Sequence, residues 1–322
     1  MHIKKRLYLY VLVDFILALI VGYFVDISKM NIKPVTITAV FIMLYPMFTG
    51  MVIEKIKKAS KNFKLITVTL FFAYIIASLT AYFISRTILK GYPEIAFAMV
   101  MVGAIPCSNM LIGWSGIADA SVEDALVIAV IGLILIPILS PIILKISGGV
   151  FVSFKIYQLV MILLLYILIP LILGLLTRRA IINKKGMDYF MEIKKIFPGI
   201  SAIGILIIVF FSVAKVARIV IKHPEIFLIV LVGLVSYYLI QTILSLIAAR
   251  ILKLKYDQGM ILILGATASS QAISLGVAAT MFSDLTVFAL SFKPILQVAY
   301  IMLLIYGLGP GIKKLLDKEN LK

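Results

Sequence analysis

Long apolar segments, separated by short polar or charged ones, make up most of the chain. Each is bounded by charged residues or by Gly and Pro, and each approaches the roughly 20 residues that a helix needs to cross a bilayer. Such segments must be helical in a membrane, because their backbone polar groups find no water there. The pattern therefore predicts an all-α polytopic membrane protein with ten transmembrane helices, at about residues 7–25, 35–53, 65–84, 95–117, 125–145, 156–176, 199–221, 226–250, 258–282 and 286–308.

The composition supports a membrane protein. Of the 322 residues, 63% are hydrophobic and 14% are charged, and the mean hydropathy is +1.17. Soluble domains are about 45–50% apolar, so a soluble enzyme, a receptor with a large ectodomain and a DNA-binding protein are excluded. Ten spans use roughly 200 residues, which predicts a single transmembrane domain over residues 1–322.

Lysine and arginine are unequally distributed between the predicted loops. With ten helices, the two termini and the even-numbered loops lie on one side and carry 21 of the 31 Lys and Arg residues, whereas the odd-numbered loops carry 7. Short basic loops stay on the cytoplasmic side. We therefore expect both termini to be cytoplasmic in the cell membrane, and the net charge of +17 to reflect orientation rather than nucleic-acid binding. The run 7–25 has no small-residue cleavage site and is expected to be a retained first helix.

The two halves of the chain share a motif. Residues 103–109 (GAIPCSN) and 265–271 (GATASSQ) both read Gly-Ala-x-x-x-Ser-amide, in the predicted fourth and ninth helices. Five helices per half place homologous halves in opposite orientations, the inverted-repeat plan of many secondary transporters. We expect inverted five-helix repeats at approximately 1–150 and 151–322.

Both motifs are suited to a broken helix. Pro106 removes a backbone donor, and the small residues Gly103 and Gly265 let backbones approach closely. Two broken helices crossing at the midplane would present helix N-termini to an anion and free carbonyls to a cation. The polar candidates for binding substrate there are Ser108, Asn109, Ser270 and Gln271. The alternative is that these side chains only join helices by hydrogen bonds.

Five further side chains are candidates for site chemistry. Cys107, the single cysteine, would be a soft thiolate ligand, or else a small packing residue. Asp14 lies inside the first helix and is a coupling carboxylate, the partner of a basic residue, or a side chain that faces interfacial water. Lys293 either attracts an anionic substrate or extends toward the outer surface. The remaining ion-binding candidates are Thr267 and Ser269.

The motifs resemble the superfamily that joins bile acid:sodium symporters with arsenical-resistance (arsenite) permeases. Ser108-Asn109 resembles the Ser-Asn pair of the symporters' fourth helix, and Ser140-Pro141 resembles a Ser-Pro near the end of their fifth. Gln271 resembles the glutamine of their ninth helix, which helps to bind sodium.

The arsenite-permease branch is similar over longer stretches. From Ala104 to about Leu144 the chain follows that family's pattern. The resemblance places Cys107 on the functional cysteine, Trp114 on a tryptophan and Glu123 on the acid that opens the fifth helix. Residues 293–298 (KPILQV) resemble the permeases' Gly-Pro-Leu-Val-Glu-Val.

The chain departs from both branches at charged positions. No acid lies between Gly265 and Phe282, where the permeases carry a glutamate. Pro106 stands where they place an arginine, and Thr267 stands where the symporters place a glutamate.

Pattern and resemblance together predict a secondary transporter that works by alternating access. The leading expectation is export of an arsenite-like metalloid, and the alternative is a small organic anion coupled to sodium or protons. No nucleotide loop, metal-ligand cluster or hydrolytic triad is present in the sequence, so we expect no enzyme and no cofactor or metal, with Na⁺ or H⁺ left open as coupling ion. The expected partners are the substrate and the lipid bilayer, with the oligomeric state left open.

Overall fold

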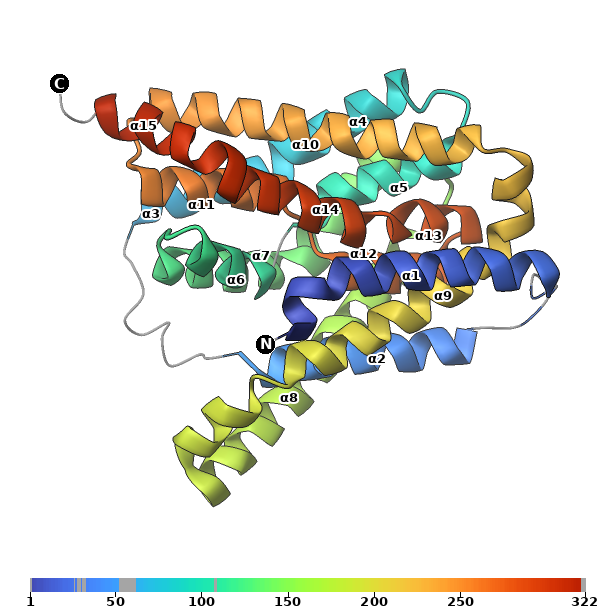
Figure 1. The fold of residues 1–322 in the computed structure, drawn as a ribbon, viewed down its shortest axis with the longest axis horizontal. Helices are drawn as coiled ribbons and strands as arrows, with labels where there is room; N and C mark the ends of the chain where they lie inside the picture. The colour runs from blue at the N-terminus through green and yellow to red at the C-terminus, as the bar shows by residue number, and fades with distance from the viewer. Residues whose placement is uncertain are drawn as a thin grey trace. The chain divides into compact units, whose positions relative to one another are not determined.

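The computed structural model describes residues 2–25, 27, 30, 33–51, 62–106 and 109–319, with side chains from Tyr10 onward in the first helix. These residues form helices joined by short turns (Figure 1). The first half contains α1 (His2–Phe24), α2 (Lys33–Thr49), α3 (Phe63–Phe71), the π-helix η2 (Phe72–Ile76), α4 (Ala77–Thr87), α5 (Pro93–Ala104), α6 (Asn109–Ile117), α7 (Val122–Ile143) and the π-helix η3 (Leu144–Gly148). The second half contains α8 (Ile156–Ile193), α9 (Phe197–Lys222), α10 (Glu225–Ile251), α11 (Tyr256–Thr267), α12 (Gln271–Met281), α13 (Asp284–Ser291), α14 (Lys293–Met302), the π-helix η4 (Leu303–Leu308) and α15 (Gly309–Glu319).

Many of these helices are long and apolar enough to cross a membrane. Among the residues the structure describes, six helical stretches meet that criterion: Phe63–Thr87, Val122–Gly148, Ile156–Ile193, Phe197–Lys222, Glu225–Ile251 and Asp284–Asp317. Shorter apolar helices cover Tyr10–Phe24, Pro34–Thr49, Pro93–Ala104 and Gln271–Met281. The chain is an all-helical, multi-pass membrane protein.

The chain forms two compact units, each built from three separate stretches. The first unit comprises residues 1–51, 155–228 and 271–295, and the second comprises residues 52–154, 229–270 and 296–322. One boundary falls between Ser270 and Gln271, inside the second of the two motifs.

In the first unit, α9 packs against both α1 and α2. Glycine makes such close approaches possible. A Cβ on Gly204 would lie 2.5 Å from the carbonyl oxygen of Ala39, so α9 and α2 meet backbone to backbone. Aromatic rings also pack against α1, where Phe15 meets Phe292 edge to face with ring centroids 4.8 Å apart.

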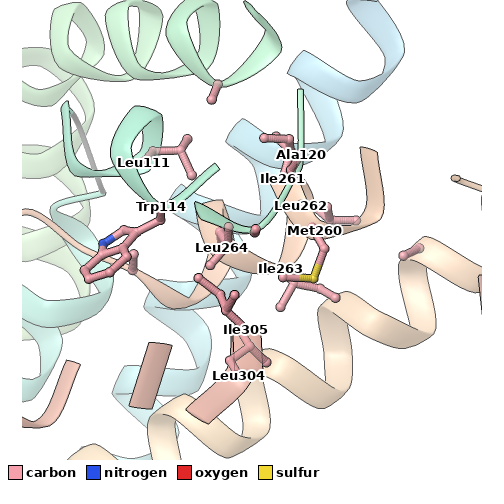
Figure 2. Close-up of a cluster of buried hydrophobic side chains, with 14 of the residues drawn as sticks. Leu111, Trp114, Ala120, Met260, Ile261, Leu262, Ile263, Leu264, Leu304 and Ile305 are labelled. Carbon is pink, nitrogen blue, oxygen red and sulfur yellow. The ribbon is translucent and has the colours of Figure 1, made fainter. Parts of the chain in front are cut away.

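The second unit has a hydrophobic core around α11. Figure 2 shows this cluster, in which residues 260–264 of α11 meet Leu111 and Trp114 of α6 and Leu304 and Ile305 of η4. The side chains from Met260 to Leu264 are all fully buried. A helix that is apolar on every face and buried on every face is typical of the interior of a membrane protein.

One segment differs from the sequence expectation. The sequence predicts a polar loop after about residue 176, whereas α8 continues as helix to Ile193 with a turn at Gly186, whose φ is 83°. Figure 1 shows this extension folding back at the end of α8. Arg178 is buried, and its guanidinium lies 5.2 Å from the ring centroid of Phe190. The cation–π contact explains why a basic residue packs into this hairpin rather than lying free in solvent.

Candidate functional site

The fourth predicted helix is interrupted where its motif begins. α5 ends at Ala104, and Ile105 is extended with φ −117° and ψ 92°. Gly103 occupies the last turn, where a Cβ would lie 2.5 Å from the carbonyl oxygen of Ala77 in α4. Pro106 follows and cannot donate a backbone hydrogen bond. The helix therefore stops inside a tightly packed region.

The ninth predicted helix is interrupted in the same way. α11 ends at Thr267, and Ala268 is extended with φ −80° and ψ 145°. Thr267 is fully buried, and its hydroxyl donates to the carbonyl oxygen of Ile263 at 2.5 Å. A Cβ on Gly265 would lie 2.5 Å from the Cγ2 of Thr69 in α3. The helix resumes at Gln271.

The two interruptions pair with each other inside the second unit. Pro106 and Ser269 form an isolated antiparallel bridge. The Ser270 N–H is shared between the carbonyl oxygens of Ile105 and Pro106, each at 3.2 Å. Backbone groups that lost their helical partners are thus satisfied by the opposite interruption, as a low-dielectric surrounding requires. The two interruptions are thus joined backbone to backbone.

Buried side chains from other helices support the pair of interruptions. The Ser140 hydroxyl of α7 donates to the carbonyl oxygen of Ala104 at 2.6 Å, and the Ser78 hydroxyl of α4 donates to that of Gly103 at 3.2 Å. Each hydroxyl satisfies a carbonyl near the end of α5, where the helical ladder supplies fewer donors.

The residue that sequence reasoning missed is Gln297 of α14, which is fully buried. Its Oε1 accepts from the Ser269 N–H at 3.3 Å, and its Nε2 donates to the Ser269 carbonyl oxygen at 3.2 Å. The sequence feature that could have identified Gln297 is its place in the segment 293–298, at the position where the permeases that this chain resembles carry glutamate. The Ser269 hydroxyl itself makes no hydrogen bond within the described part of the chain.

A second group of polar side chains lies in the first unit, at the start of α12. Gln271 is 2% exposed, and neither its Nε2 nor its Oε1 makes a hydrogen bond to the residues described. The Lys293 ammonium is fully buried and donates to the Ser274 hydroxyl at 3.0 Å. The Ser274 hydroxyl in turn donates to the carbonyl oxygen of Gln271 at 3.3 Å. Lys293 therefore does not extend to the surface.

Other predicted site residues are placed elsewhere or fall outside the description. Cys107 and Ser108 lie outside the described residues, and Asn109 is described only as the first residue of α6. Asp14 of α1 is partly buried, and its Oδ2 makes no hydrogen bond among the residues described. Within the same part of the chain, His, Cys, Asp and Glu form no group able to hold a metal ion.

A surface pocket of about 470 Å³ lies in the first unit, between α8 and α12. Its lining residues are Tyr157, Gln158, Met161, Ile162, Thr280 and Met281. None of the residues singled out from the sequence lines it.

Comparisons with known proteins identify the family of this chain. Over 197 residues, 58% of this chain, the sequence is 28% identical to the Arsenical-resistance protein Acr3 of Alkaliphilus metalliredigens, but the match covers only 55% of that protein, little more than half its length. Over 289 residues, 84% of this chain, it is 20% identical to the Arsenical-resistance protein Acr3 of Corynebacterium glutamicum, covering 78% of that protein. The family model for the Sodium Bile acid symporter family matches residues 37–224, more than half of the chain. This multi-pass membrane protein therefore belongs to the Sodium Bile acid symporter family, a family of transporters.

Proposed function

We propose that this protein is a secondary transporter that exports an arsenite-like metalloid, as the oxyanion or as its neutral acid. The observation that carries the proposal is the similarity to two proteins named for arsenical resistance, at 28% and 20% identity. Trivalent arsenic is a soft centre that seeks thiols, and Cys107 is the one cysteine of the chain, within the fourth-helix motif. We assign Cys107 as a substrate ligand.

The proposed architecture has ten spans in two inverted repeats, about 1–150 and 151–322. Supporting it, the pattern α5–interruption–α6 followed by α7 recurs as α11–interruption–α12 followed by α13 to α15. The excess of Lys and Arg in the termini and even-numbered loops, 21 against 7, supports cytoplasmic termini.

Transport would proceed by alternating access. The first unit contains α1 and α2 from the first half of the chain and α8, α9, α12 and α13 from the second half. The second unit contains the paired interruptions. We assign the two units as the bodies that move during transport. Substrate would be bound near the midplane by Ser108, Asn109, Ser270 and Gln271 together with Cys107.

The residues at the interruptions are poorly suited to bind sodium as a coupling ion. Thr267 replaces the glutamate of the symporters that this chain resembles, and its hydroxyl is donated to Ile263 of its own helix. The N–H and the carbonyl oxygen of Ser269 are both hydrogen-bonded to the side chain of Gln297. We therefore propose protons as the coupling ion, with Asp14 as the carboxylate that carries them, because its Oδ2 has no hydrogen-bond partner among the described residues.

A small organic anion is the second candidate substrate. The buried ammonium of Lys293 favours it, because a fixed positive charge attracts a carboxylate.

Counterflow in proteoliposomes tests the substrate without knowledge of the coupling ion. Vesicles holding the purified protein are loaded with unlabelled arsenite, and uptake of radiolabelled arsenite is followed after dilution, with no ion gradient imposed. A carrier for arsenite gives a transient overshoot that excess external arsenite abolishes. Equal traces from protein-containing and protein-free vesicles would contradict the proposal, and simple equilibration without an overshoot would indicate a channel.

A further inference from the structure

The helical hairpin at the end of α8, residues 177–196, carries a dense group of basic side chains. It contains six Lys and Arg residues and two acids. The exposed basic residues are Arg179, Lys184, Lys185 and Lys195. The large exposed apolar side chains of the preceding span end with Leu176, which is 57% exposed. The basic residues therefore begin directly after the apolar face of α8.

The hairpin has a defined shape. Gly186 forms its turn with φ 83°, a conformation that glycine adopts without strain. Inside the hairpin, the guanidinium of the buried Arg178 lies 5.2 Å from the ring centroid of the buried Phe190. At the turn, Lys185 Nζ lies 4.5 Å from the ring centroid of Tyr189. The exposed basic side chains are thus presented by helices rather than by an irregular loop.

Apolar side chains lie exposed beside the basic ones. Met187, Tyr189 and Met191, in the second arm of the hairpin, are 37%, 39% and 42% exposed. Met187 and Met191 are one helical turn apart and so share a face. A short helix that combines exposed Lys or Arg with exposed apolar and aromatic side chains is typical of helices that lie in the membrane interface.

The direction of the hairpin decides how close its tip comes to the lipid headgroups. Lys185 is nine residues beyond Leu176, about 14 Å along a helix. If the hairpin stood upright, the tip would lie beyond the ~8 Å over which salt screens charge at physiological ionic strength. Figure 1 shows instead that the hairpin extends obliquely beyond α2 and away from α1, the other helices of the first unit that lie nearby.

We propose that this hairpin lies on the bilayer surface and binds anionic lipid headgroups. Lys184 and Lys185 donate to phosphate oxygens, while Met187 and Met191 enter the interface below the headgroups. The excess of basic over acidic residues matches the negative charge of such lipids. Lipid is the occupant because the hairpin continues directly from a span, which keeps headgroups at high local concentration beside it. This surface is separate from the interruptions and from the transported solute.

Hydrogen–deuterium exchange of the full chain in nanodiscs tests this assignment. One preparation holds phosphatidylcholine alone, and the other holds an equimolar mixture of phosphatidylcholine and phosphatidylglycerol. We expect the backbone amides of residues 179–193 to exchange at least about fivefold more slowly in the anionic nanodiscs, because one Lys or Arg near the surface contributes about that factor. The difference should shrink at high ionic strength, since salt screens the attraction.

A double variant, Lys184→Gln with Lys185→Gln, removes the two charges at the tip. Both side chains are exposed, and glutamine is as good a helix former as lysine, so the hairpin should still fold. We expect this variant to exchange equally in the two lipid compositions. Lys90→Gln with Lys222→Gln is the matched control, because it removes two exposed lysines outside the hairpin and should keep the wild-type difference.

Three results would overturn the assignment. The first is equal exchange of wild type in both lipid compositions. The second is a difference that persists in the tip variant, as expected of an upright hairpin whose lysines are out of reach of the headgroups. The third is slowing of the same size when soluble polyglutamate is added to phosphatidylcholine nanodiscs, which would make an acidic polypeptide the partner. Arsenite counterflow is a separate readout, so failure of the proposed function would leave this assignment standing.

Discussion

The side-chain amide of Gln297 bonds both backbone polar groups of Ser269, accepting from its N–H at 3.3 Å and donating to its carbonyl oxygen at 3.2 Å. An amide copies the hydrogen-bonding pattern of a neighbouring strand, so Ser269 is held extended between Gln297 and Pro106. The interruption of the ninth helix is thereby fixed by a residue 28 positions further along the chain.

Replacing Gln297 with leucine should destabilise the protein by about 2 kcal/mol or more, because two buried backbone groups lose their partners. The melting temperature of the purified protein in detergent measures the effect. A leucine variant as stable as wild type would show that the interruption does not depend on this amide.

Gln297→Glu should make stability depend on pH. The protonated acid can both accept from and donate to Ser269, whereas the carboxylate can only accept. The stabilising contact is therefore present at low pH, where the side chain is protonated, and is lost when it ionises at higher pH. Melting curves between pH 5 and 9 should show the glutamate variant losing stability relative to wild type, and parallel curves would contradict the role.

Ser140→Ala tests the support of the other interruption. Its hydroxyl bonds the Ala104 carbonyl oxygen, near the end of α5. Ser245→Ala is the matched control, because that buried hydroxyl bonds only carbonyls of its own helix, α10. We expect Ser140→Ala to cost about 1 kcal/mol more than the control, measured as the difference in thermal stability, and equal costs would argue against the support.

Gly103→Ala should strongly impair folding. The new Cβ would meet the Ala77 carbonyl oxygen at 2.5 Å and the Ala81 Cβ at 2.7 Å, neither of which is the end of a flexible side chain. Overpacking of this kind costs about 1–3 kcal/mol. Gly113→Ala is the control, since nothing lies within 4 Å of its added Cβ. Yield of monodisperse protein in size-exclusion chromatography measures both, and equal yields would contradict the close packing.

The two interruptions can be predicted from the sequence, but the side chains that support them cannot. Pro106 and the glycines of the two motifs are local signals, and local signals predict where a helix ends. The pairing of Gln297 with Ser269 and the contact of Lys293 with Ser274 join residues 28 and 19 positions apart, and neither follows from helical periodicity. The helical hairpin at the end of α8 was not predicted, because its basic residues were interpreted as a polar loop. Lys and Arg are also good helix formers.

Asp14→Asn tests the coupling assignment separately from substrate binding. A neutral amide cannot carry a proton, so proton-driven accumulation of arsenite in vesicles should be lost while counterflow, which needs no gradient, persists. Asp188→Asn is the control, because Asp188 is exposed near the turn of α8. Loss of counterflow together with accumulation would instead make Asp14 part of the substrate site or of the fold.

The most direct test of metalloid export is arsenite accumulation in everted membrane vesicles with an imposed proton gradient, compared between wild type and Cys107→Ser. Export from a cell becomes uptake in everted vesicles. We predict saturable accumulation above empty vesicles that collapses with the gradient, and its loss in Cys107→Ser, because a hydroxyl is a poor ligand for a soft centre. Wild type that is folded and inserted but accumulates no more arsenite than empty vesicles would contradict metalloid export.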